Sequence, residues 1–220
     1  MPELNFTQAR FNMIEQQVRP WEVLDQQVLD VMSQIPREAF VPDAYAHLAF
    51  ADIEIPLAHN QVMMPPKLEG RVVQSLLLKP TDRVLEIGTG SGYVTALLAA
   101  LANHVDTVDA FIDFVEDSRT KLAAHHIKNV TCHAGDAVNG WNTHIRYDAI
   151  ILTGSVPILK PHWQAQLAID GRLFAIVGQA PIMEAKLITR INEHEWIEDS
   201  LFETSIPAIM GAPKLNAFVF

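Results

Sequence analysis

The chain has 220 residues and a formal net charge of −10, and 49% of its residues are hydrophobic. This length suggests one α/β domain with an extension, and the apolar content is enough for a sizeable core. The acidic balance argues against nucleic-acid binding, because phosphate neutralisation needs a positive surface. No apolar run reaches the roughly 18 residues of a membrane span, so we expect no membrane partner.

Cysteine usage and the first residues point to a cytoplasmic protein. Cys132 is the single cysteine of the chain, so no intramolecular disulfide can form. Residues 1–10 lack the charged and apolar regions of a secretory signal. The neighbouring His125 and His126 would point in different directions from a helix end, and we expect no metal site. The sequence leaves the oligomeric state open.

Residues 1–80 are predicted to form a helical extension that also carries part of the active site. Its predicted elements, in chain order, are a helix over 7–19, a second helix behind an Asp25 N-cap that stops at Pro36, a proline-bounded turn over 35–42, a short helix over 44–48, an extended piece over 53–57, an irregular stretch over 59–66 and a helix over 67–78. No Gly/Ser linker follows, so this extension is expected to pack on the rest of the chain.

Residues 81–220 alternate between strand and helix patterns, which is typical of a doubly wound, Rossmann-like, mostly parallel sheet with helices on both faces. Strands are predicted over 83–87, 105–108, 130–132, 147–152 and 173–177, with helices over 93–101 and 112–125. Three more strand candidates, 187–191, 200–203 and 217–220, could close the sheet with antiparallel pairs.

The core is organised around the stretch from Val84 to Tyr93, which reads VLEIGTGSGY. An apolar strand pattern enters a turn with glycine at every second position, and a helix follows. Glycine at such a turn lets the backbone approach a ligand closely. The dinucleotide fingerprint would need a third glycine at Tyr93, so the spacing is G-x-G-x-G instead. The stretch therefore predicts a nucleoside-cofactor site.

Three other strand ends carry suitable polar residues. In a doubly wound sheet the ligand lies at the carboxyl ends of the strands. Asp109 ends the second strand, about twenty residues after the glycine turn, where an acid can bind both ribose hydroxyls. Asp136 follows the third strand, where a carboxylate can accept from an adenine amino group. Thr153 ends the fourth strand, where the transferred group would meet its acceptor.

The glycine turn, with Glu86 two residues before the first glycine, resembles motif I of the S-adenosylmethionine-dependent methyltransferases. Most of the chain further resembles one family, the protein-L-isoaspartate O-methyltransferases. The likeness rests on IPREAFVP (35–42), AFAD (49–52), the run 84–93, YDAIILTG (147–154) and 167–178. The resemblance implies S-adenosylmethionine as cofactor and a protein or peptide substrate. The implied reaction is methylation of the free carboxylate of isoaspartyl residues in damaged proteins, which starts their repair.

The resemblance also implies roles for individual residues. The cofactor contacts would be Glu86, Gly88, Thr89, Gly90, Gly92, Asp109, Asp136 and Ala137. The substrate contacts would be Gln61, Val62, Met63, Met64 and Thr153.

One departure from the family concerns the segment over the active site. The family has a Gly-Gln-Thr-Ile-Ser-Gln-Pro type segment, whereas this chain reads NQVMMPP over 60–66. Val62 replaces the threonine, and Met64 replaces the serine used near the reacting carboxylate, so no catalytic residue is assigned. Hydrogen bonds to a charged group are worth roughly 1.5–3 kcal/mol each, and neither replacement supplies one. We therefore expect weak isoaspartyl activity with normal cofactor binding, unless backbone N–H groups act as donors.

The acceptor chemistry leaves two alternatives open. A carboxylate is already ionised at pH 7, so transfer to it needs alignment and desolvation more than a base. A hydroxyl or amine acceptor would need a base, and His59 beside the segment could serve, although a lone histidine is more often a surface residue. The alternatives are a methyltransferase for a less polar small molecule and a non-catalytic module that binds the cofactor.

Overall fold

A computed structural model describes residues 5–142 and 144–212 of the chain. The helices, short helical turns included, are α1 (Phe6–Met13), a π turn (Ile14–Val18), 3-10 turns (Arg19–Trp21, Arg37–Ala39, Asp43–Leu48 and Ala58–Asn60), α2 (Gln26–Gln34), α3 (Pro66–Ser75), α4 (Tyr93–Leu101), α5 (Ile112–Ala124) and α6 (Pro161–Ala165). The strands are β1 (Ile55–Pro56), β2 (Val62–Met63), β3 (Arg83–Ile87), β4 (His104–Asp109), β5 (Val130–Ala134), β6 (Tyr147–Val156), β7 (Leu167–Gln179), β8 (Ile182–Arg190) and β9 (Trp196–Thr204).

The main sheet has seven strands in the order β5-β4-β3-β6-β7-β8-β9. The strands from β5 to β7 are parallel, while β8 and β9 are added in antiparallel pairs. The chain runs from β3 outward through β4 to β5 and then returns to β6 on the other side of β3. The carboxyl ends of β3 and β6 therefore form the switch point at which doubly wound sheets bind ligands.

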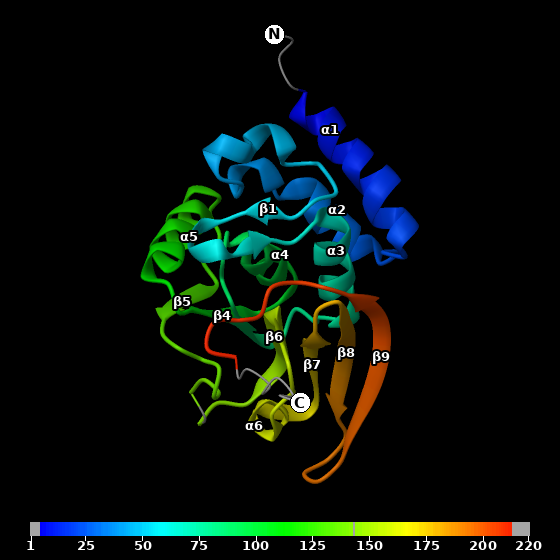
Figure 1. Ribbon diagram of the computed structural model, residues 1–220, viewed down its shortest axis with the longest axis vertical. Coiled ribbons are helices and arrows are strands. Elements are labelled where there is room, and N and C mark those ends of the chain that lie inside the picture. The colour runs from blue at the N-terminus through cyan, green and yellow to red at the C-terminus, as the bar shows by residue number, and fades with distance from the viewer. Residues whose placement is uncertain (1–4, 143, 213–220) are drawn as a thin grey trace, which may run out of the picture.

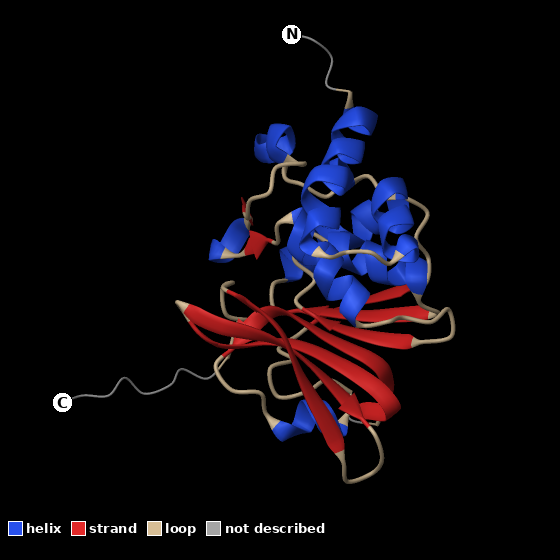
Figure 2. Ribbon diagram, turned by 90° about the vertical axis from the view of Figure 1, so that its right-hand side faces the viewer, coloured by secondary structure: helices blue, strands red, loops and turns tan. Residues whose placement is uncertain are grey.

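Both faces of the sheet are buried, as the continuous apolar run of β6 predicts. Ala149 and Ile151 face a core shared with α2, α3 and α4, whereas Ile150 and Leu152 face a second core that includes Trp163 of α6. Figure 2 shows the larger helical layer on one side of the sheet and α6 on the other. The doubly wound, mostly parallel fold predicted from the sequence is confirmed, but the described part of the chain covers the second face thinly.

Several predicted boundaries differ from the structure. The helix expected over 7–19 remains an α-helix to Met13 and then widens into the π turn before Pro20, which has no backbone N–H to donate. The predicted Asp25 N-cap is confirmed, since its side chain accepts from Gln27 N. In the irregular stretch 59–66, Val62 and Met63 pair with Pro56 and Ile55.

The predicted strands of the antiparallel half are longer in the structure. The strand expected over 173–177 spans Leu167–Gln179, because both the parallel β6 and the antiparallel β8 pair along it. The expected strands 187–191 and 200–203 fall within or overlap β8 and β9. The candidate over 217–220 lies outside the described residues.

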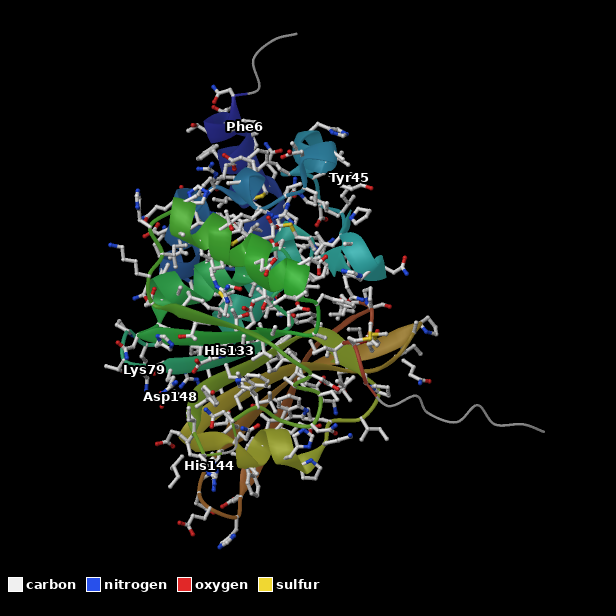
Figure 3. All side chains as sticks on the ribbon, turned by 90° about the vertical axis from the view of Figure 1, so that its left-hand side faces the viewer. Phe6, Tyr45, Lys79, His133, His144 and Asp148 are labelled. Carbon is white, nitrogen blue, oxygen red and sulfur yellow. The ribbon has the colours of Figure 1, made fainter. Side chains whose placement is uncertain are left out.

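The segment that follows β9 returns across the sheet to β6, as the red part of the ribbon in Figure 1 shows. Ser155 N donates to Pro207 O at 3.0 Å, and Ile209 N donates to Ser155 O at 2.9 Å. Figure 3 places Lys79 and Asp148, near the amino ends of β3 and β6, on the side of the sheet away from this segment. The segment after β9 therefore lies at the carboxyl ends of the strands.

Candidate functional site

A cleft lies at the switch point between β3 and β6. It encloses about 700 Å³ of empty space, its open mouth included, and the ends of β3, β4 and β6 line it. A smaller cavity of about 330 Å³ adjoins it. Both cavities share the same five lining residues, which are Val62, Met64, Gly88, Gly90 and Thr153. The two cavities therefore form one site with a junction at the glycine turn.

The glycine turn has the backbone conformation that its spacing predicts. Gly88, Gly90 and Gly92 have φ angles of 98°, 50° and 83°, in the left-handed region that favours glycine. A Cβ on Gly88 would lie 2.2 Å from Thr153 Oγ1, so this glycine lets β3 and β6 converge. A Cβ on Gly92 would lie 2.8 Å from Ser118 Cβ, and Gly92 is outside the lining of both cavities. Gly92 thus serves the packing of α4 on α5.

Two of the predicted acids lie in the larger cleft. Asp109 at the end of β4 accepts from Gly90 N at 2.9 Å and from Phe111 N at 3.0 Å. Burial raises the pKa of Asp109 above its ordinary value, and the hydrogen bonds from the backbone oppose that rise. Asp136 accepts from Val138 N at 2.9 Å. Both carboxylates line the cleft together with Ala137, as predicted.

Glu86 is fully buried and lies outside the lining of both cavities. Thr95 and Thr107 donate to its Oε2 at 2.5 and 2.7 Å, and Thr107 Oγ1 lies 2.7 Å from Thr89 Oγ1. Glu86 Oε1 has no partner within the described chain. Burial raises the pKa of Glu86 to about 8. The structure therefore joins Glu86 to the glycine turn through Thr107 and Thr89. The expected contact of Glu86 with the cofactor stays a prediction.

The predicted substrate segment forms one wall of the site. Gln61, Val62 and Met64 line the larger cleft, and Met63 lines the smaller cavity. Met64 is buried, and its carbonyl oxygen accepts from Arg37 Nη2 at 2.7 Å.

Arg37 holds this wall through a buried ion pair. Its guanidinium also donates to the carbonyl of Ala49 and bonds Glu69 through Nε at 2.8 Å, and neither charged side chain is exposed. Burial raises the pKa of Glu69 above its ordinary value, while the charge of Arg37 opposes that rise. Glu69 lines the smaller cavity. Arg37 thus connects the family-like 35–42 stretch to the backbone of Met64.

Thr153 is in the cleft, but its hydroxyl proton is already used. Thr153 Oγ1 lies 2.6 Å from Gly88 O and 2.9 Å from Ile87 O, both of which can only accept. The hydroxyl therefore fixes the end of β6 to the end of β3. An anionic acceptor at the junction would have to take its hydrogen bonds from other groups.

Sequence reasoning missed two groups of lining residues. Phe111 and Phe114 stand at the start of α5, directly after Asp109, and that position at a strand end was a usable signal. The second group lies after β9, and no periodicity indicates that it returns to the cleft. It consists of Ile206, Pro207, Ile209 and Met210.

The described residues were compared with the requirements of a metal site and of a membrane-spanning helix. Within 5–142 and 144–212, no group of three or more His, Cys, Asp or Glu side chains is arranged to hold a metal ion. None of the helices described here combines the length and the apolar character needed to span a membrane.

Comparison with known proteins gives a consistent result. The family model "Protein-L-isoaspartate(D-aspartate) O-methyltransferase (PCMT)" matches residues 8–209. A protein-L-isoaspartate O-methyltransferase of Rhodopseudomonas palustris is 36% identical over 201 residues, covering 91% of this chain and 92% of the relative. One from Klebsiella pneumoniae is 35% identical over 205 residues, covering 92% and 97%.

A solved structure shares the fold across nearly the whole chain. It is a Plasmodium falciparum protein described as a protein-L-isoaspartate O-methyltransferase, in complex with S-adenosyl-L-homocysteine. The TM-score is 0.79 at 20% identity, covering 94% of this chain and 99% of the other.

Proposed function

Since the chain belongs to the protein-L-isoaspartate O-methyltransferase family and is an S-adenosylmethionine-dependent methyltransferase of isoaspartyl residues, we propose that the two joined cavities carry this reaction. The observation that supports this assignment is their position. They meet at the switch point of the sheet, with two carboxylates on the larger cleft and the glycine turn between the cavities.

The larger cleft fits the nucleoside half of the cofactor. Asp109 would accept from the ribose hydroxyls and Asp136 from the adenine amino group. The left-handed Gly88 and Gly90 leave room for close approach of the ligand. The smaller cavity, with Glu69 in its wall, would take the amino-acid half. We assign Glu86 a supporting role, in which it fixes the turn through Thr107 and Thr89.

The junction of the two cavities is where methyl transfer would occur. When bound, S-adenosylmethionine supplies a methyl group on a positively charged sulfur. Transfer of this group to one oxygen of the acceptor carboxylate, with cleavage of the C–S bond, would give a methyl ester and a neutral thioether. No proton is transferred, so the site needs no base. Val62 and Met64 would exclude water from the junction, and Arg37 would hold the Met64 backbone in place.

We further propose that the substrates are proteins or peptides and that esterification starts their repair. The carbonyl carbon of the ester is more electrophilic than that of the carboxylate, so the neighbouring backbone nitrogen can form a C–N bond to it while the C–O bond breaks and methanol leaves with the nitrogen's proton. The lone Cys132, which allows no intramolecular disulfide, supports a cytoplasmic location. The comparisons favour this acceptor over the less polar small molecule that Val62 and Met64 suggested.

The test is transfer of a labelled methyl group to an isoaspartyl peptide. The matched control is the same peptide with an ordinary aspartyl residue, and calorimetry with S-adenosylhomocysteine measures the cofactor site separately. We expect methylation of the isoaspartyl peptide alone. Tight cofactor binding without transfer to this peptide would contradict the acceptor assignment, and transfer to an apolar hydroxyl compound would then favour the alternative.

A further inference from the structure

His59 links the substrate segment to the first turn of α5. Its ring stacks on Phe111 with the centroids 3.9 Å apart and the planes 2° from parallel. It also meets Phe114 edge-on at 5.5 Å. Its Nε2 donates to Asp113 Oδ2 at 2.8 Å. This hydrogen bond lowers the pKa of Asp113 below its ordinary value. His59 is therefore a surface residue, as expected for a lone histidine, but α5 holds its ring in place, and the ring lies outside the lining of both cavities.

The backbone at His59 and Asn60 has an unusual, left-handed conformation. His59 and the next residue, Asn60, have φ angles of 57° and 56°. For residues other than glycine the left-handed conformation is unfavourable, and two in succession persist only where the surroundings fix them. The stack on Phe111, the bond to Asp113 and the hydrogen bond from Gln61 Nε2 to His59 O at 3.2 Å all hold His59 in place.

These contacts join two parts of the cleft wall. Phe111 and Phe114 line it on the α5 side, and Leu57, Gln61 and Val62 line it from the substrate segment. The His59 ring lies outside the lining and connects these walls. A bound nucleoside could leave across this side of the cleft only if the walls separate, which would break the stack.

We propose that His59 is a positioning residue that closes segment 57–64 over the cofactor cleft and slows the release of the cofactor product. The proposal rests on the proposed function in one respect, that the larger cleft holds the cofactor. The stacked rings contribute most of the closure. The Asp113 pair contributes less, because both partners are substantially exposed, at 38% and 55%, and water and salt screen it.

The test separates the stack from the ion pair. His59→Ala removes both contacts, His59→Phe keeps an aromatic ring without the pair, and Asp113→Asn keeps the ring and removes the charge. His47→Ala is the matched control, because His47 is an exposed histidine of the same helical layer. One readout is the dissociation rate of S-adenosylhomocysteine, followed by stopped-flow tryptophan fluorescence. The other is amide hydrogen exchange over residues 57–64 in the ligand-free protein.

We expect His59→Ala to raise the dissociation rate about three- to tenfold, in keeping with the loss of an aromatic pair, with little change in the association rate. Exchange over 57–64 should also become faster. His59→Phe should restore both quantities, while Asp113→Asn and His47→Ala should stay within about twofold of the unmodified protein. Release and exchange that are unchanged in His59→Ala would overturn the proposal, and so would His59→Phe behaving like His59→Ala.

The outcome remains separable from that of the proposed function. If the unmodified protein does not bind S-adenosylhomocysteine, the proposed function fails. The exchange of residues 57–64 in the ligand-free protein still tests whether His59 holds the segment closed.

Discussion

Asp109 has both carboxylate oxygens engaged by backbone N–H groups before any ligand binds. Each oxygen keeps further lone pairs that could accept from a ribose hydroxyl. Asp109→Ala should therefore weaken S-adenosylhomocysteine binding by about 1.5–3 kcal/mol, the usual range for hydrogen bonds to a charged group. Calorimetry measures this, with Asp30→Ala on the exposed side of α2 as control. An unchanged affinity in a folded Asp109→Ala protein would remove Asp109 from the cofactor site.

Glu86 makes the stability of the protein depend on pH in a defined direction. Its pKa is about 8 in the folded protein against 4.5 for an ordinary glutamate side chain, so the folded state keeps a proton that the unfolded state releases. The free energy of unfolding should therefore fall as pH rises from about 4.5 to about 8 and level off above that range. Below it, the carboxyl is protonated in both states and adds no pH dependence.

Glu86→Gln removes this titration and keeps the shape of the side chain. The free energy of unfolding can be measured with denaturant at several pH values. Between about pH 5 and pH 8, that of the variant should rise by several kcal/mol relative to that of the unmodified protein, since each pKa unit corresponds to about 1.4 kcal/mol. Parallel stability curves for the two proteins would show that Glu86 is ionised in the folded state at neutral pH.

Val62 and Met64 are expected to limit the rate on an isoaspartyl peptide. Val62→Thr with Met64→Ser restores the hydroxyls of the family pattern at the junction of the two cavities. The value of kcat/KM should rise by roughly tenfold per recovered hydrogen bond. Cofactor affinity should change little, because Asp109 and Asp136 are untouched. If the unmodified protein is already fast and the double variant is no faster, backbone N–H groups supply the donors.

At the scale of elements, the turn between β3 and α4 tests whether the backbone itself cradles the ligand. Gly90 has a φ of 50°, and its Cβ position is open except for Leu57 Cδ1 at 3.5 Å. Gly90→Val would bring a branched side chain into the cleft and strain the left-handed backbone. We expect S-adenosylhomocysteine binding to disappear while the far-ultraviolet circular dichroism stays that of the folded protein. Normal binding would mean that this turn does not approach the ligand.

Most elements were predictable because their signals are local. The run of apolar residues in β6 and the glycine spacing before α4 required no knowledge of distant contacts. The substrate segment was harder, because β1 and β2 pair over only two residues each and Arg37 fixes the wall from a distant stretch. The glycine motif also could not predict the surroundings of the Glu86 carboxylate, because they depend on the direction in which the side chain points. In the sequence His59 is a lone histidine, and its stack on Phe111 could not be predicted because it depends on how the fold places α5.

The whole molecule shows why the two predicted parts are not independent. The larger core joins residues of the extension, such as Met32 and Val72, to Val84 and Ile151 of the sheet. The wall formed by Gln61, Val62 and Met64 belongs to residues 1–80, and the rest of the larger cleft is lined mainly by residues 81–220. The return of the segment after β9 depends on the antiparallel half of the sheet, and sequence patterns do not fix where such a connection goes. The division of the chain into an extension (1–80) and a core (81–220) therefore stays a prediction from the sequence.

The antiparallel addition of β8 and β9 leaves β9 at an edge of the sheet formed by residues 5–142 and 144–212, and this position has a consequence for the protein at high concentration. An open edge can pair with the edge of another copy and begin aggregation. β9 carries Glu198, Asp199 and Glu203 and has no lysine or arginine. Two such edges would bring like charges together in a molecule that is already acidic, so repulsion keeps the copies apart. Added salt shortens the range of this repulsion, and the protein should consequently be most resistant to self-association at low ionic strength.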